Sequence, residues 1–126
     1  MNPQVILIAD DYPDSCRALK RLLEKMGYHV ECVTTGSDAV AMTHTIRPNL
    51  IILDAAMPGM DGLEVLRQLR NEEATKDVPV LFYSAHNDPA LIERAKELGA
   101  DDWLMKGTAD WMNLLGKVSS LYAAPS

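Results

Sequence analysis

Polar and charged side chains stand directly after four short apolar runs of this chain. They are Asp10 and Asp11, Asp54, Ser84 and Lys106, which follow the runs 4–9, 50–53, 78–83 and 103–105. The run 50–53, Leu-Ile-Ile-Leu, is typical of a fully buried parallel strand because it is branched, uninterrupted and bounded by proline and glycine. In open α/β sheets ligands bind at the carboxyl ends of the strands. These side chains are therefore the candidate site.

The residue types in this set suit phosphoryl chemistry on a carboxylate. Three carboxylates at one sheet edge repel each other and require a cation, and Mg²⁺ takes carboxylate oxygens while bridging to phosphate. Asp54 would be the nucleophile that forms an acyl phosphate. Lys106 would act as a point charge on the phosphate oxygens, and the hydroxyl of Ser84 could donate a hydrogen bond to them.

Five strands alternate with five helices, which predicts a parallel sheet covered on both faces. The expected strands are 4–9, 29–33, 50–53, 78–83 and 103–105, and the expected helices begin near Pro13, Gly36, Leu63, Asp88-Pro89 and Thr108. The alternating pattern of 29–33 indicates an edge strand, and residues 71–77 are expected to be a solvated loop. The last helix carries an apolar stripe of Trp111, Leu114, Leu115, Val118 and Leu121. Strand order is not determined by these patterns.

Composition limits the possible classes of protein. A chain of 126 residues with 48% apolar residues predicts one folded domain. The net charge of −6 argues against a nucleic-acid partner, since phosphate backbones are bound by basic surfaces. No apolar run of about 18 residues and no signal segment is present, which predicts a cytoplasmic protein with no membrane partner. Cys16 and Cys32 are expected to be reduced packing residues.

The combination Asp10-Asp11, Asp54, 57–62 (Met-Pro-Gly-Met-Asp-Gly), Ser84 and Lys106 resembles the receiver domain of two-component response regulators. The resemblance is to the chemotaxis regulator class and covers essentially the whole chain. It implies a doubly wound, flavodoxin-like α/β fold, in which a five-stranded parallel sheet has the order 2-1-3-4-5 and is flanked by five helices. Residues 1–126 would then be a single receiver domain with its core at about 4–122.

The same resemblance implies a role for each site residue. Asp54 would be the phosphoacceptor, charged by a histidine kinase or a histidine phosphotransfer protein. Mg²⁺ would be held by Asp10, Asp11, Asp54 and the backbone carbonyl of Ala56. The chain would be a switch rather than an enzyme.

The resemblance also implies an output mechanism. Ser84 and Lys106 would bind the phosphoryl group, and Ser84 and Trp103 would form the switch. The face of the fourth helix, fifth strand and last helix would bind a downstream protein or a second copy of the chain.

Three positions depart from the family pattern. Gly107 replaces the usual proline after the lysine, and a cis bond there is not expected because a non-proline cis peptide costs about 2.5–4 kcal/mol. Trp103 replaces the usual Tyr or Phe, and Ser84 replaces Thr. His86, two residues beyond Ser84, lies at a position that influences dephosphorylation in the family, although an exposed loop histidine is the default interpretation.

Two other functions remain open at this point. A Mg²⁺-dependent aspartyl-phosphate phosphatase commonly has a second aspartate two residues after its nucleophile, where this chain has Ala56. A phosphorylation-independent, receiver-like binding module is the other alternative, and it depends on what Gly107 does to the site.

Overall fold

Five parallel strands form one sheet in the order β2-β1-β3-β4-β5 in the computed structural model, which describes residues 5–107 and 111–122. The strands are β1 (Val5–Ala9), β2 (His29–Val33), β3 (Leu50–Leu53), β4 (Val80–Ser84) and β5 (Asp102–Met105). The expected strand order and the edge position of β2 are confirmed.

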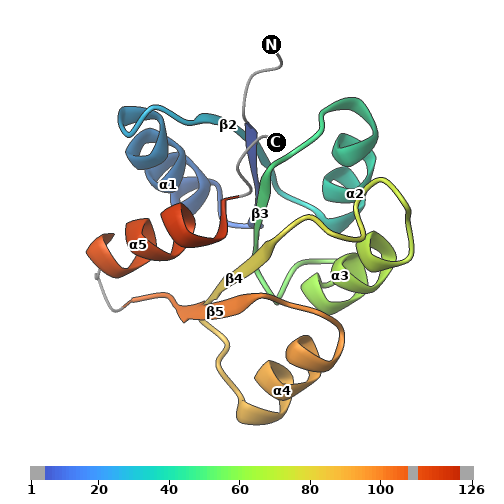
Figure 1. The fold of residues 1–126 in the computed structure, drawn as a ribbon. Helices are drawn as coiled ribbons and strands as arrows, with labels where there is room; N and C mark the ends of the chain where they lie inside the picture. Colours follow the sequence, from blue (N-terminus) through green and yellow to red (C-terminus); the bar gives the residue numbers. More distant parts are fainter. Residues whose placement is uncertain (1–4, 108–110, 123–126) are drawn as a thin grey trace.

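Helices cover both faces of the sheet (Figure 1). They are α1 (Pro13–Lys25), α2 (Gly36–Thr45), α3 (Gly62–Arg70), α4 (Pro89–Glu97) and α5 (Trp111–Leu121). In Figure 1, α1 and α5 lie on one face, whereas α2, α3 and α4 lie on the other. The doubly wound fold expected from the sequence is therefore confirmed.

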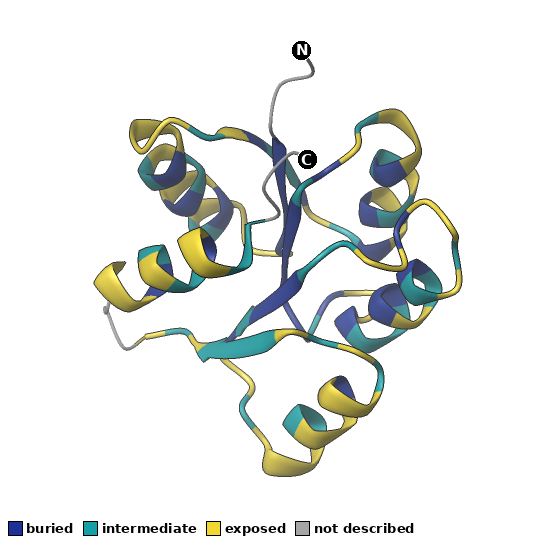
Figure 2. Ribbon diagram, in the orientation of Figure 1, coloured by how far each residue is buried: buried dark blue, intermediate teal, exposed yellow. Residues whose placement is uncertain are grey.

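The core has two layers, one on each face of the sheet. Side chains of β1 alternate between them, since Ile6 and Ile8 pack with α1 and α5 while Leu7 packs with α2 and α3. Figure 2 shows the central strands as the most deeply buried part of the molecule, whereas the outer surfaces of α4 and α5 are exposed. Because helices cover both faces of the sheet, the side chains on both faces of the central strands are buried. This explains why the central strands are unbroken apolar runs.

Helix ends follow the predicted signals. Pro13 begins α1, and Asp88 caps α4 by accepting a hydrogen bond from the backbone N–H of Ala90. Asp61 caps α3 in the same way, through the N–H of Glu64 at 2.9 Å. The predicted cap at Thr108 lies outside the described residues.

The fourth strand lies two residues later at its start and one later at its end than the predicted 78–83. The N–H of Val78 donates to Thr75 in a turn, while the N–H of Val80 donates to the carboxylate of Asp101. Ser84 pairs with Met105 of β5, so Ser84 is the last residue of the strand and does not follow it.

The loop 71–77 is not simply solvated, contrary to the prediction. Thr75 is buried, and its hydroxyl donates to the carbonyl of Leu69 at 2.6 Å. Arg70 donates from one guanidinium nitrogen to the carbonyls of Thr75, Lys76 and Val78. A single arginine thus organises the loop, an arrangement that has no periodic signal in the sequence.

The predicted stripe of α5 is wrong at its first residue. Leu114 and Val118 are buried, but Trp111 remains 41% exposed. Trp111 is the first residue of α5 and lines a surface hollow with Trp103 and Leu104 of β5 instead of entering the core. Among the described helices, none has the length and apolar character needed to cross a membrane.

Candidate functional site

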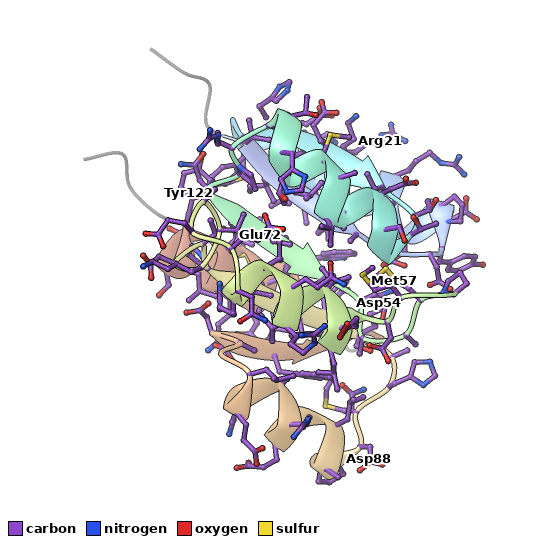
Figure 3. The ribbon with its side chains drawn as sticks, turned by 90° about the vertical axis from the view of Figure 1, so that its right-hand side faces the viewer. Arg21, Asp54, Met57, Glu72, Asp88 and Tyr122 are labelled. Carbon is purple, nitrogen blue, oxygen red and sulfur yellow. The ribbon has the colours of Figure 1, made fainter. Side chains whose placement is uncertain are left out.

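Strand register brings the predicted site residues to one edge of the sheet. Ala9 is aligned with Leu53, and Leu53 with Phe82, so that β1, β3 and β4 end side by side. The N–H of Asp54 donates to the carbonyl of Ala9 at 2.9 Å, which places Asp54 beside Asp10. Figure 3 shows Asp54 with Met57 at one end of the molecule, far from Tyr122.

Asp10, Asp11 and Asp54 form an acidic cluster at this edge. Each offers one carboxylate oxygen, and the three oxygens lie within 4.8 Å of one another. Asp10 and Asp54 are buried, whereas Asp11 is exposed. A hard divalent cation prefers such oxygen ligands and keeps water on its open side, so the donor set fits Mg²⁺.

Lys106 lies between the two buried carboxylates of the cluster. Its Nζ is 2.5 Å from Asp10 Oδ2 and 3.2 Å from Asp54 Oδ2. Burial alone would lower the pKa of Lys106, but the contacts with Asp10 and Asp54 raise that pKa above its ordinary value. Lys106 is therefore an ammonium ion within reach of any group bound to Asp54.

Burial has the opposite effect on Asp54. It raises the pKa of the carboxyl group, and the opposing contacts with Lys106 and with the N–H of Ala56 do not cancel this effect. An ionised Asp54 is thus held at a cost in folding free energy, and additional positive charge at the cluster would reduce that cost.

Ser84 is completely buried at the end of β4. Its Oγ accepts a hydrogen bond from the backbone N–H of His86 at 3.1 Å, and its carbonyl accepts from the N–H of Lys106 at 2.8 Å. The chain around Ser84 is therefore joined to the residue that contacts both buried carboxylates. His86 itself is exposed.

Trp103 is half-buried and stacks on Phe82, with ring centroids 4.8 Å apart and planes 13° apart. Its indole Nε1–H donates to the side chain of Asn87 at 2.7 Å. Asn87 was not among the residues predicted for the site, because a polar residue in a loop carries no periodic signal. Its only sequence cue is its position three residues beyond Ser84.

The loop after Asp54 returns tightly to the start of α3. The N–H of Gly62 donates to the carbonyl of Ala55 at 2.9 Å, and a Cβ at Gly62 would overlap the carbonyl oxygen of Asp54. Asp61 and Gly62 thus serve the helix start, and Gly62 also permits the close approach that fixes Asp54. Met57 is buried in this loop.

Gly107 takes a left-handed conformation with φ of +87°, and the described residues contain no cis peptide. Proline could not adopt this backbone, because its ring fixes φ near about −65°. The loop after Lys106 thus uses a conformation that the usual family residue excludes, while Lys106 still contacts both carboxylates.

The sequence of this chain is similar to those of known proteins. A family profile described as the response regulator receiver domain matches residues 6–117. Protein PilH of Pseudomonas aeruginosa is 32% identical over 118 residues, which are 94% of this chain and 97% of that protein. Transcriptional regulatory protein AfsQ1 of Streptomyces coelicolor is 37% identical over 105 residues, 82% of this chain. This chain spans only 44% of the length of AfsQ1, and less than half of several similar regulators.

Solved structures agree with the sequence relatives. Chemotaxis protein CheY4 of Vibrio cholerae matches with a TM-score of 0.88 at 28% identity, covering 95% of this chain and 99% of that one. The receiver domain of a histidine kinase from Syntrophus aciditrophicus matches with a TM-score of 0.85 at 37% identity, covering 94% and 89% of the two chains. On the family profile, the relatives and the fold together, this chain belongs to the response regulator receiver domains of two-component signalling.

Proposed function

We propose that residues 1–126 are a single receiver domain, with its core at about 4–122, that acts as a phosphorylation-activated signalling switch rather than as an enzyme. It accepts a phosphoryl group on Asp54 from a histidine kinase or a histidine phosphotransfer protein in a Mg²⁺-dependent reaction. Phosphorylation then changes a protein-binding surface. The location that this proposal implies is the cytoplasm.

The observation that supports the proposal best is the position of Lys106. Its Nζ lies between Asp10 and Asp54, two carboxylates that are themselves buried. A surface lysine would find such partners by chance only rarely, and burying one paired cation with two anions costs folding free energy. This arrangement is therefore better explained by a negatively charged group that joins the site than by stability.

Asp54 is the nucleophile in the proposed step. A carboxylate oxygen of Asp54 attacks phosphorus, the bond from phosphorus to the donor's imidazole nitrogen breaks, and the electron pair returns to that nitrogen. Lys106 then shifts its contact from the Asp54 carboxylate to the phosphoryl oxygens that it can reach from the same position. Ser84 Oγ, which accepts from His86, can donate its own proton to the same oxygens.

Asp10, Asp11, Asp54 and the backbone carbonyl of Ala56 are the groups that would hold Mg²⁺. When bound, the ion would neutralise charge on the transferring phosphoryl group and on the crowded carboxylates. The exposure of Asp11 leaves an entry path from solvent on one side of the cluster.

Ser84 and Trp103 are the proposed switch. A phosphoryl group adds charge and acceptor oxygens that draw Ser84 toward Asp54, and this movement biases a two-state element. Trp103 would then move into the space that Ser84 leaves. Its ring already packs on Phe82 in the neighbouring strand.

The surface that would change is the face of α4, β5 and α5, and a downstream protein or a second copy of the chain would bind there. It exposes Met105, Trp111 and Met112, and a hollow of about 220 Å³ lies beside Trp103 and Leu114. Large apolar side chains gathered on one face are typical of interaction sites. We propose no direct contact with nucleic acid or membrane for this domain.

Phosphorylation with a small donor tests the proposal directly. The protein is incubated with acetyl phosphate, with and without Mg²⁺, and its intact mass is measured. We expect one phosphoryl group per chain, only with Mg²⁺, and none in Asp54→Asn. Lys106→Ala should still be labelled but should lose the conformational response.

Other outcomes favour other functions. Labelling at a residue other than Asp54 would exclude the mechanism. Continuous hydrolysis of p-nitrophenyl phosphate that depends on Asp54 would favour the phosphatase. Absence of labelling in a protein that binds Mg²⁺ normally would favour the phosphorylation-independent binding module.

A further inference from the structure

The only two cysteines of the chain lie against each other in the structure. Cys16 is in the first turns of α1, and Cys32 is in the edge strand β2. Both belong to the core layer on the face of the sheet that α1 and α5 cover. Residues separated by half a helix, a turn and part of a strand are thus brought to one point by packing.

Reciprocal contacts fix the pair. The Sγ of Cys32 lies 3.5 Å from the carbonyl oxygen of Cys16, and the Sγ of Cys16 lies 3.8 Å from the carbonyl oxygen of Val33, the residue next to Cys32. Each thiol therefore lies against the backbone of the element that carries the other cysteine. A disulfide requires sulfurs at about 2.05 Å, so both side chains would have to rotate toward each other on oxidation.

The two thiols differ in environment, as the partners of a reactive pair do. Cys16 is only 3% exposed, whereas Cys32 is partly accessible from the sheet edge. The contact with Cys16 lowers the pKa of the Cys32 thiol; burial opposes this effect, as do Glu24 and Glu31, whereas nearby Lys20 supports it. The same contact and burial raise the pKa of Cys16.

We propose that Cys16 and Cys32 are a peroxide-sensitive dithiol site that closes to an intramolecular disulfide. The Cys32 thiolate attacks one oxygen of hydrogen peroxide, the O–O bond breaks, and hydroxide leaves, which oxidises Cys32 to a sulfenic acid. The sulfur of Cys16 then attacks the sulfur of Cys32. The S–O bond breaks, and the hydroxyl leaves with the thiol proton of Cys16 as water.

The position of the pair gives the modification a local consequence. The carbonyl of Val33, which Cys16 contacts, also accepts a hydrogen bond from the N–H of Asp10 at 3.1 Å. A disulfide would therefore tie α1 to β2 beside the strand end that carries Asp10. This inference does not rest on the proposed function, since its chemistry needs neither Mg²⁺ nor a phosphodonor.

The test treats the reduced protein with a small molar excess of hydrogen peroxide, quenches it with an alkylating reagent, and measures intact mass and linked peptides. We expect loss of two hydrogens, a linkage between the peptides of Cys16 and Cys32, and full reversal by dithiothreitol. The oxidised protein should melt a few degrees higher, since the cross-link restricts the unfolded chain.

Two variants separate the roles of the thiols. Cys32→Ser should slow peroxide-dependent thiol loss by about tenfold or more, because the buried Cys16 is the poorer nucleophile. Cys16→Ser, or Cys16→Ala if the serine variant is unstable, should instead accumulate a sulfenic acid at Cys32 that dimedone traps. Addition of two or three oxygens to wild-type Cys32 without a linkage, a disulfide between two chains, or two thiols that stay reduced would each overturn the proposal.

Discussion

The indole of Trp103 is hydrogen-bonded to Asn87, with Nε1 2.7 Å from Oδ1, while its ring lies on Phe82. Asn87 belongs to the loop that leaves Ser84, so the aromatic residue is joined to the site through this loop as well as through its own strand. This contact holds Trp103 in one position in the present structure.

Trp103 emission should report occupation of Asp54. In a Trp111→Phe background, addition of beryllofluoride with Mg²⁺ should change Trp103 fluorescence, and Ser84→Ala should reduce that change. Asn87→Ala should alter the emission of the free protein, since the indole loses a partner worth about 0.5–1.5 kcal/mol. Asp54→Asn serves as the control that does not respond. An unchanged spectrum in protein whose Asp54 is demonstrably occupied would show that Trp103 is a fixed core residue.

Magnesium should stabilise the fold through the acidic cluster. At a Mg²⁺ concentration ten times the Kd, mass action contributes about 1.4 kcal/mol, which raises the melting temperature by several degrees. Asp11→Ala should abolish this rise without disturbing the core, because Asp11 is exposed. The measurement is thermal melting in MgCl₂ and in KCl of equal ionic strength, with Glu93→Ala, an exposed carboxylate of α4, as the matched variant. An equal rise in Asp11→Ala would argue against the proposed ligands.

Asp54→Asn should stabilise the protein without Mg²⁺ at neutral pH. Burial raises the pKa of Asp54 above its unfolded value, so ionisation costs folding free energy. This cost is absent below about pH 4, grows as pH rises from the unfolded to the folded pKa, and is complete above the folded pKa. We therefore expect Asp54→Asn to be more stable than the wild type at pH 7.5 in the absence of Mg²⁺.

Urea unfolding at several pH values measures this gain, and it should disappear near pH 4. Glu93→Gln, on an exposed helix surface, should change stability little at any pH. A gain for Asp54→Asn that is independent of pH would mean that ionisation is not its cause.

Gly62→Ala should destabilise the fold and weaken the site together. The added Cβ would overlap the carbonyl oxygen of Asp54 and lie 3.0 Å from the ring of Phe82, so we expect a loss of about 1–3 kcal/mol. Gly116→Ala is the matched control, since a Cβ there has open space in a helix and should add up to about 1 kcal/mol. Denaturant unfolding measures both variants, and beryllofluoride binding by Gly62→Ala tests the displacement of Asp54. Equal stability of the two variants would contradict the close approach.

Arg70→Ala should cost about 2 kcal/mol or more, because one guanidinium group satisfies several backbone carbonyls. Its nitrogens lie 2.7 Å from the carbonyl oxygen of Val78 and 2.8 Å from that of Gly99. Arg67→Ala, in the same helix, removes only an exposed pair with Glu64 and should change stability little. Urea unfolding compares the two variants, and Arg70→Lys should rescue Arg70→Ala poorly because lysine cannot reach both sites at once. Similar losses at positions 67 and 70 would show that the network is unimportant.

The sequence by itself determined the alternation of strands and helices, because apolar runs, caps and glycines act over a few residues. Proline at position 13, the cap at Asp61 and the buried run 50–53 all signal their elements locally. For the same reason it predicted which residues stand at strand ends, so Asp10, Asp54, Ser84 and Lys106 could be grouped without a structure. The strand order came from family resemblance, since local patterns do not specify which strands pair.

Tertiary structure alone decided how distant side chains meet. Lys106 reaches Asp10 across 96 positions of sequence, Asn87 reaches the indole of Trp103, and Arg70 gathers the carbonyls of a loop predicted to be solvated. Trp111 has the spacing of a buried stripe, yet it is exposed at the first residue of its helix. These outcomes depend on how the helices and strands pack against one another. Residue type and spacing along the chain do not specify which distant side chain or carbonyl becomes a contact.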